Sequence, residues 1–251
     1  MRPLRLGETD ALPQGDHAAS GVVLSRREGS LRAQDLTLFL SGRGLLRVGA
    51  PGADGAKNRF GGGTEPLVWG TFHLYQSPRR LYLKGVDAKE DFWVVRTSPH
   101  TLRTALAWNA SLLSLLPEGL ENDSLLSLLW GCMKHLAAGV APALLDLRFA
   151  WRWGSLWGLA PSLDQCTGCG RTLDAERAAF GREGLFCSIC AESPDRRAST
   201  TPLPPDMLDL LRRAGMLPRD AFAAWAPSCP PDRLKALKPY AAWAYSFLGN
   251  A

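Results

Sequence analysis

Four cysteines in two identical spacings are the residues of this sequence best suited to chemistry. Cys166 and Cys169 are separated by two residues, as are Cys187 and Cys190, with 17 residues between the pairs. Two intervening residues let one tight turn direct both thiolates at a single tetrahedral metal ion, and glycines beside the first pair leave room for backbone amides near the sulfurs. Four thiolates complete the coordination of Zn2+ and leave no open position for a reacting water. We therefore predict one structural zinc ion.

Three other interpretations of these cysteines remain open: two disulfides, a redox-active pair, or a site that has lost its metal. Disulfides are disfavoured in a reducing cytoplasm, and a redox CxxC motif usually lies in a βαβ unit, which the helical pattern around these cysteines does not provide. The other two cysteines, Cys132 and Cys229, lie elsewhere, in segments predicted to be helical. We exclude them as ligands and expect ordinary thiols there.

A second group of residues could bind a polyanion. The formal net charge of the chain is +5, and residues 21–100, with 12 basic and 7 acidic side chains, carry an excess of the same size. A basic region beside a near-neutral one indicates a polyanionic partner. We predict that this region binds DNA through ten candidates: Arg26, Arg27, Arg32, Arg43, Arg47, Lys57, Arg59, Arg79, Arg80 and Lys84.

Aromatic residues alternate with these basic ones along the chain. They are Phe39, Trp69, Phe72, Tyr75 and Tyr82. OB-type barrels bind single strands by combining a cationic groove with aromatic faces on which bases stack. Core packing is the competing role, and we predict it for Trp69, Phe72 and Tyr82. The charges are then the better signal for DNA.

Catalytic signatures are missing from the sequence. It has no GxxxxGK[ST], GxGxxG, GxSxG or HExxH motif, and its four histidines, His17, His73, His100 and His135, are dispersed. We therefore expect a protein that is not an enzyme. The longest apolar stretches, such as residues 125–130, are far shorter than the roughly 20 residues that cross a bilayer, and the N-terminus lacks a signal pattern. We expect a soluble cytoplasmic protein with no membrane partner.

The elements that must position these residues begin with a predicted barrel. Residues 1–20 show no apolar period and are expected to form a flexible N-terminal arm. The second strand-like run places Leu36, Leu38 and Leu40 on one face. The glycine-rich connection 51–66 is expected to be mobile and exposed. A compact barrel is predicted at 21–98, with strand-like runs at 21–27, 35–41, 44–50, 67–76 and 80–86.

A helical period replaces the strand period after residue 98. The first helix is expected from Pro99 through Leu116, and Asp123 is expected to cap the second. Residues 99–251 are therefore predicted to form an all-helical domain, with the cysteine module inserted at about 160–195. The further helices are expected at 123–139, 142–157, 204–214 and 231–247.

In this order of features the sequence resembles the RecO family of bacterial recombinational repair proteins, over about residues 21–247. The most specific segment is LAPSLDQCTGCG from Leu159, which leads into the cysteines. Before Lys57 the family usually has a more basic run than Ala53-Asp54-Gly55-Ala56. Two further segments carry the resemblance: VVLSRREGSLRAQDLTLFLSGRGLLRVGAPG from Val22, and Lys57-Asn-Arg59 with Phe60-Gly-Gly and Glu65-Pro66-Leu67.

The resemblance implies an α+β fold, with an N-terminal five-stranded OB-fold barrel followed by a helical domain with a four-cysteine zinc module, and no catalytic turnover. It implies binding of single- and double-stranded DNA and annealing of complementary strands. It also implies cooperation with RecR in loading RecA onto DNA coated by single-strand-binding protein. The expected location is cytoplasmic and nucleoid-associated.

Two alternative functions remain. DNA glycosylases of the formamidopyrimidine type also end with a helical region and a CxxC…CxxC zinc finger, but the start Met1-Arg2-Pro3-Leu4 places neither their proline nor their glutamate where that chemistry needs it. A protein-interaction scaffold with an incidental basic barrel is the other. Salt distinguishes it from a DNA-binding protein, because about five cations on single-stranded phosphates give a slope of log affinity against log salt of about −3 to −4.

Overall fold

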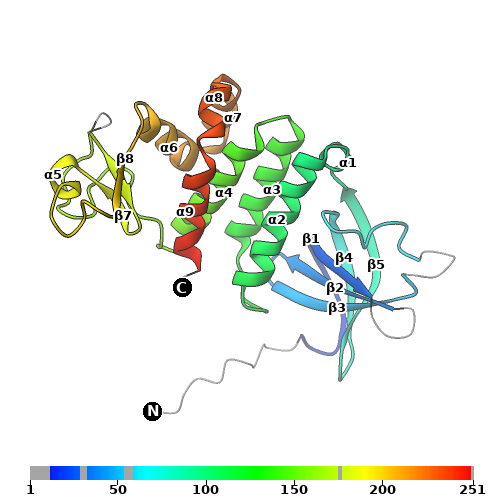
Figure 1. Cartoon of the computed structure of the whole chain (residues 1–251). Helices are drawn as coiled ribbons and strands as arrows, with labels where there is room; N and C mark the ends of the chain where they lie inside the picture. Colours follow the sequence, from blue (N-terminus) through cyan, green and yellow to red (C-terminus); the bar gives the residue numbers. More distant parts are fainter. Residues whose placement is uncertain (1–11, 29–32, 54–58, 175–176, 250–251) are drawn as a thin grey trace, which may run out of the picture. The chain divides into compact units, whose positions relative to one another are not determined.

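The computed structural model describes residues 12–28, 33–53, 59–174 and 177–249 (Figure 1). The chain forms two compact units, Met1–Met133 and Lys134–Ala251. The first unit contains the strands predicted from the alternating pattern, and the second contains most of the predicted helices and the four cysteines.

Five strands of the first unit close into a barrel in the order β1-β2-β3-β5-β4. This is the OB-fold architecture that the resemblance implied. Its core is formed by inward-facing residues such as Leu36, Leu38, Leu40, Phe72 and Leu83. The strands are β1 (Gly15–Glu28), β2 (Ala33–Leu40), β3 (Gly44–Pro51), β4 (Trp69–Gln76) and β5 (Leu81–Glu90).

The predicted N-terminal arm was wrong over residues 15–20, which form the first half of β1. These residues pair antiparallel with 71–76 of β4. Asp16, Ala18 and Ser20 are exposed on one face of the strand, and the other face carries small or polar residues such as Ala19. An apolar alternation is therefore absent here, and pairing with β4 defines the strand instead.

The barrel unit continues beyond the predicted boundary at residue 98. Helix α2 (Pro99–Leu115) is joined to β1 by buried Asn109, whose Nδ2 donates to the Leu24 carbonyl at 3.0 Å. Trp130, on α3 (Asp123–Ala137), packs edge-on against Trp69 at 4.9 Å and against Phe92 at 5.4 Å between ring centroids. A short helix, α1 (Trp93–Arg96), connects the barrel to α2. These contacts are long-range, so the change of period at 98 does not reveal them.

The cap of α3 differs from the prediction by one residue. Asn122 Oδ1 accepts the backbone N–H of Leu125 at 3.0 Å, which is the N-cap contact. The Asp123 carboxylate instead accepts hydrogen bonds from the Ser41 hydroxyl at 2.9 Å and from the Gly42 N–H at 2.8 Å. Asp123 therefore fastens the β2–β3 turn to the start of α3.

The second unit is built around α4 (Pro142–Leu156), which packs against α6 (Met207–Met216) and α9 (Lys238–Leu248). Buried Arg148 of α4 donates to the Ala214 and Leu217 carbonyls at 2.9 Å each, at the end of α6. Two further helices are α7 (Arg219–Trp225), which the pattern did not predict, and α8 (Pro231–Lys235); Ala226–Ser228 forms a 3-10 turn. No helix in the described ranges is long and apolar enough to cross a membrane.

The predicted helix at 231–247 is two helices, α8 and α9. Pro239 lies in the first turn of α9, where its missing N–H costs nothing, whereas inside one continuous helix it would remove a hydrogen bond to the preceding turn. The cysteine module contains a three-stranded sheet of order β7-β6-β8, with α5 (Ser188–Ala191) after β7. Its strands, β6 (Ala179–Gly181), β7 (Gly184–Phe186) and β8 (Thr200–Pro202), are too short to produce a recognisable alternation.

Candidate metal centre and nucleic-acid interface

The four cysteines come from two knuckles that the module sheet holds together. Cys166 and Cys169 lie on the loop before β6, where Gly170, at a φ of +71°, donates its N–H to the Cys166 carbonyl at 2.8 Å. Cys187 follows β7, and Cys190 lies on α5. A hydrogen bond of 2.8 Å from the Thr167 N–H to the Leu185 carbonyl joins the first knuckle to β7.

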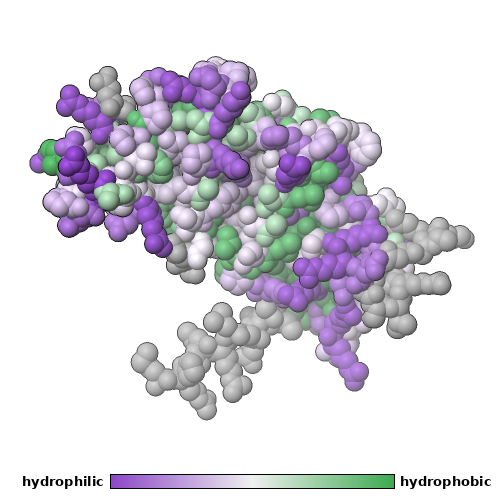
Figure 2. Space-filling model, viewed as in Figure 1, coloured by the Kyte–Doolittle hydropathy of each residue, from purple (hydrophilic) through white to green (hydrophobic). Residues whose placement is uncertain are grey.

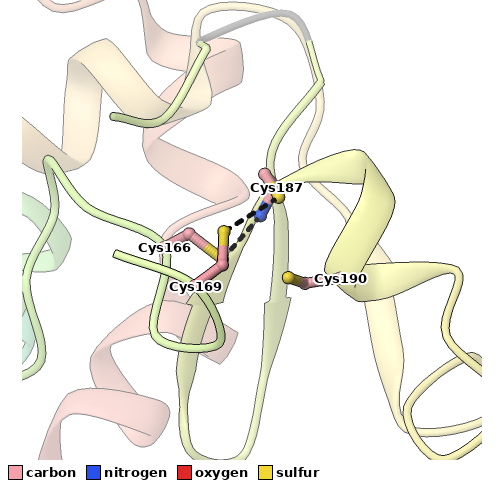
Figure 3. A group of neighbouring side chains, drawn as sticks. All are labelled: Cys166, Cys169, Cys187 and Cys190. Atoms are coloured by element: carbon pink, nitrogen blue, oxygen red, sulfur yellow. Dashed lines mark hydrogen bonds between the residues drawn. The ribbon is translucent and has the colours of Figure 1, made fainter. Parts of the chain in front are cut away.

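The four sulfur atoms all lie within 4.8 Å of one another (Figure 3). The Sγ atoms of Cys169 and Cys187 are 3.8 Å apart. Tetrahedral Zn2+ with bonds of about 2.3 Å places neighbouring sulfurs about 3.8 Å apart, so the donor set and its spacing fit such an ion. The Cys187 N–H also points at Cys166 Sγ, at 3.3 Å, which is the amide-to-sulfur contact expected around a thiolate.

The pKa values of two thiols in the cluster are shifted in opposite directions by their surroundings. Burial acts to raise the pKa of Cys166, but backbone N–H groups of Cys187, Cys169 and Gly168 outweigh it and lower the pKa to about 6. The pKa of Cys190 is raised to about 12, chiefly by its hydrogen bond to Cys169 and then by burial. A divalent cation would stabilise all the thiolates together, so the cluster is suited to hold a metal ion.

Cys132 and Cys229 are buried thiols outside this cluster. Within the described part of the chain, Cys166, Cys169, Cys187 and Cys190 are the one group of cysteine, histidine and acidic residues close enough to hold a metal ion.

A groove of about 820 Å3 runs over β2 and β3 and is bounded by the end of β1, the β4–β5 connection and the end of α2. In OB-folds the face of the second and third strands, with the loops beside it, binds oligonucleotides. We call it the arginine groove, because four of the ten predicted DNA-binding residues line it. Its charged residues are Arg27, Arg47, Arg79 and Arg80, with Glu28, Asp35 and Glu118.

Two of the four arginines already have carboxylate partners. Arg47 Nε pairs with Glu118, and an Arg80 terminal nitrogen pairs with Asp35. Arg27 and Arg79 form no ion pair within the residues described. Phosphates could therefore contact Arg27 and Arg79 directly, but they would compete with carboxylates for the other two.

Four of the remaining basic candidates are described by the structure and lie outside the groove lining. Arg26 is partly buried and pairs with Glu65. Arg43 is exposed on the β2–β3 turn. Arg59 is exposed and donates to the Lys84 carbonyl at 3.2 Å, and Lys84 pairs with Asp16 at 2.8 Å. Arg32 and Lys57 lie outside the described residues.

The aromatic candidates divide between the core and the surface. Trp69 and Phe72 are buried, at 8% and 0% exposure, as predicted, and Phe39 is buried too. The core role predicted for Tyr82 was wrong, because this side chain is 37% exposed, as is that of Tyr75. Position 82 faces outward in a strand whose inward positions are taken by Leu81 and Leu83, which is a period-2 signal present in the sequence.

Sequence reasoning missed the acidic residues of the groove. Asp35 lies one position from Leu36 and so on the opposite, outward face of β2, which alternation could have revealed. Glu118 lies on the α2–α3 connection, and the bridge that pairs it with Leu45 brings it to the groove. No local signal in the sequence indicates that contact.

A comparison with protein-family models matches residues 96–245 to the model described as Recombination protein O C terminal. Curated proteins named DNA repair protein RecO match a larger part of the chain. The relative from Desulforamulus reducens is 28% identical over 178 residues, which are 70% of this chain and 69% of the relative.

Two further relatives carry the same name. The protein from Rubrobacter xylanophilus is 26% identical over 205 residues, covering 80% of this chain and 82% of its own length. The protein from Bacillus pumilus is 26% identical over 198 residues, covering 77% and 75%.

Proposed function

The chain belongs to the RecO family of DNA repair proteins, and from this membership we propose that it is a DNA-binding recombination mediator that anneals complementary strands. The observation that supports the proposal most is the arginine groove, in which four arginines gather on the ligand-binding side of an OB-fold barrel. The proposed activity requires no catalytic turnover.

Arginines in the groove suit the needs of an annealing protein. Two complementary strands repel each other through their phosphates, and contacts that neutralise phosphates lower that repulsion without reading sequence. Arg27 and Arg79 are the first candidates for these contacts, because the described residues place no carboxylate in an ion pair with either. Arg47 and Arg80 would bind phosphates only after breaking their ion pairs with Glu118 and Asp35.

We also propose that the four cysteines bind one Zn2+ with a structural role. The ion would link the two knuckles and thereby hold the module sheet and α5 together. No open coordination position would remain for catalysis. Ligand number, ligand type and sulfur spacing support zinc.

The partner proteins that we propose are those implied by membership of the RecO family. We propose that the protein works with RecR to load RecA onto DNA coated by single-strand-binding protein, and that it binds both single- and double-stranded DNA. This work takes place on chromosomal DNA, so a cytoplasmic, nucleoid-associated location is part of the proposal.

The proposal is tested by fluorescence anisotropy of a labelled single strand at several salt concentrations. Four groove arginines on single-stranded phosphates predict a slope of log affinity against log salt of about −3. The variant Arg27→Glu, Arg79→Glu should bind more weakly and lose between one and two units of slope. A matched control is Arg103→Glu, Arg182→Glu, which reverses two exposed arginines outside the groove.

Strand annealing is measured in parallel with two complementary oligonucleotides that carry a fluorescent donor and acceptor. The groove variant should anneal more slowly than the control variant. Absence of binding at low salt would contradict the proposal and favour the protein-interaction scaffold. Equal losses in both double variants would show that total charge, not the groove, determines binding.

A further inference from the structure

Two exposed tyrosines form a cross-strand pair on the outside of the barrel. Tyr75 of β4 and Tyr82 of β5 are direct partners in the antiparallel register, and each is 37% exposed. Directly opposed residues on one face have Cβ atoms about 4.5–5.5 Å apart, so the two side chains leave the sheet next to each other. Neither ring is needed by the barrel core, which Phe72, Leu74 and Leu83 fill from the other face.

The tyrosine pair lies in one row of strand partners with the arginine groove. Asp35 in the groove pairs with Gly49 of β3, Gly49 pairs with Tyr82, and Tyr82 pairs with Tyr75. A methyl group on Gly49 would lie 3.3 Å from Arg80 Nε and 3.4 Å from Tyr82 Cδ1. Arg80, which lines the groove, and Tyr82 therefore both lie over the backbone of Gly49. The arginine groove is thus adjacent to the tyrosine pair.

The polar side chains beside the tyrosines already have carboxylate partners. Lys84 lies 5.9 Å from the Tyr75 ring centroid and pairs with Asp16 at 2.8 Å. His73 Nε2 lies 2.7 Å from Asp87. Figure 2 shows mostly hydrophilic residues on the part of the barrel that it views and colours. Around Tyr75, where Lys84 and His73 already contact carboxylates, a neutral, flat group fits better than a phosphate.

A hollow adjoins Tyr75 on the same face. Its volume is about 500 Å3, and it is lined by Asp16, His17, Ala18, His73, Leu74, Lys84 and Gly85, from β1, β4 and β5. The hollow is deep at Ala18 and Gly85 because these residues have small side chains or none. Lys84 lies between the hollow and the Tyr75 ring. A flat group stacked on Tyr75 would have room beside it.

We propose that Tyr75 and Tyr82 stack unpaired bases of single-stranded DNA while the arginine groove holds the phosphates of the same strand. The inference rests on the proposed function and adds the part of the ligand that this face recognises. Every base presents a π-face, so stacking on tyrosine is tolerant of sequence, whereas a duplex keeps its bases inside. The tyrosine pair would therefore favour single strands over duplex.

The test compares Tyr75→Ala and Tyr82→Ala with Tyr75→Phe and Tyr82→Phe, in the full-length protein. Trp93→Ala, which removes an aromatic ring that is 67% exposed on α1, is the control. Affinities are measured for oligothymidine, for an abasic strand of equal length and charge, and for a duplex. Loss of one stacked base costs about 1–3 kcal/mol, which is about fivefold or more in affinity.

Each alanine variant should bind oligothymidine at least about fivefold more weakly, with its salt slope unchanged, and should bind the abasic strand and the duplex as the unaltered protein does. The phenylalanine variants and Trp93→Ala should bind normally. Normal binding of oligothymidine by both alanine variants would overturn the inference while leaving the proposed function intact. So would equal losses for the abasic strand. If the unaltered protein bound none of the three DNAs, the proposed function would fail and the inference with it.

Discussion

Replacing Glu118 with glutamine should tighten binding of single-stranded DNA to the arginine groove. The Glu118 carboxylate pairs with Arg47 Nε, and both side chains line the groove. A phosphate must displace that carboxylate before it can pair with Arg47. Glutamine keeps the size and the hydrogen-bonding oxygen of the side chain but removes its charge, so this competition disappears.

The expected gain is limited because the pair is exposed. The side chains of Arg47 and Glu118 are 79% and 43% exposed, and ion pairs at such positions contribute about 0–1 kcal/mol. Since about 1.4 kcal/mol corresponds to a tenfold change, Kd should fall by up to about fivefold at low salt. The gain should shrink as salt screens both the pair and the phosphate contact.

The assay is fluorescence anisotropy with oligothymidine at a low and a near-physiological salt concentration. Glu121→Gln is the matched control, because it removes the same charge from the same connection but does not line the groove. In an Arg47→Gln background, Glu118→Gln should have no further effect. Unchanged or weaker binding by a stably folded Glu118→Gln protein would refute the reasoning, as would an equal gain in Glu121→Gln.

Three further predictions concern stability. Gly44→Ala should lower the Tm of thermal unfolding more than Gly42→Ala. Both glycines have a positive φ, at +70° and +65°, where alanine costs about 1–2 kcal/mol of backbone strain. Only at Gly44 would the added methyl also lie 2.1 Å from a backbone carbonyl oxygen, and relieving that clash should cost about 1–3 kcal/mol more. Cys187→Ser should lower zinc content and Tm together, as measured by metal analysis and calorimetry, whereas Cys229→Ser should keep the metal; loss of metal with unchanged stability would count against a structural role. Burial, followed by nearby arginines, lowers the pKa of His135 below 6.5, so the unfolded chain binds this proton more readily. The neutral His135 side chain should contribute fully to the free energy of unfolding above pH 6.5 and progressively less below it. In denaturant unfolding, His135→Gln should therefore lose less stability between neutral and acidic pH than the unaltered protein. An identical pH dependence of the two proteins would contradict the lowered pKa of His135.

An uninterrupted period marks several of the elements that were predicted correctly. Leu36, Leu38 and Leu40 alternate because β2 has one face in the barrel core. The first half of β1 was missed because small and polar residues line it, and its partner strand lies more than fifty residues away. Pro239, which divides the last predicted helix, acts through a missing N–H and leaves the apolar pattern unbroken.

The sequence by itself determined the cluster of four cysteines, because one tight turn with two intervening residues positions both thiols of each pair. It also determined that the barrel region is basic. Only the tertiary structure decided which basic residues lie together, because barrel closure brings Arg27 and Arg79 to one groove from distant parts of the barrel sequence. The same closure places Glu118 against Arg47 and leaves Tyr82 outside the core. Charge pairing and exposure depend on neighbours distant in the chain, and no local pattern encodes them.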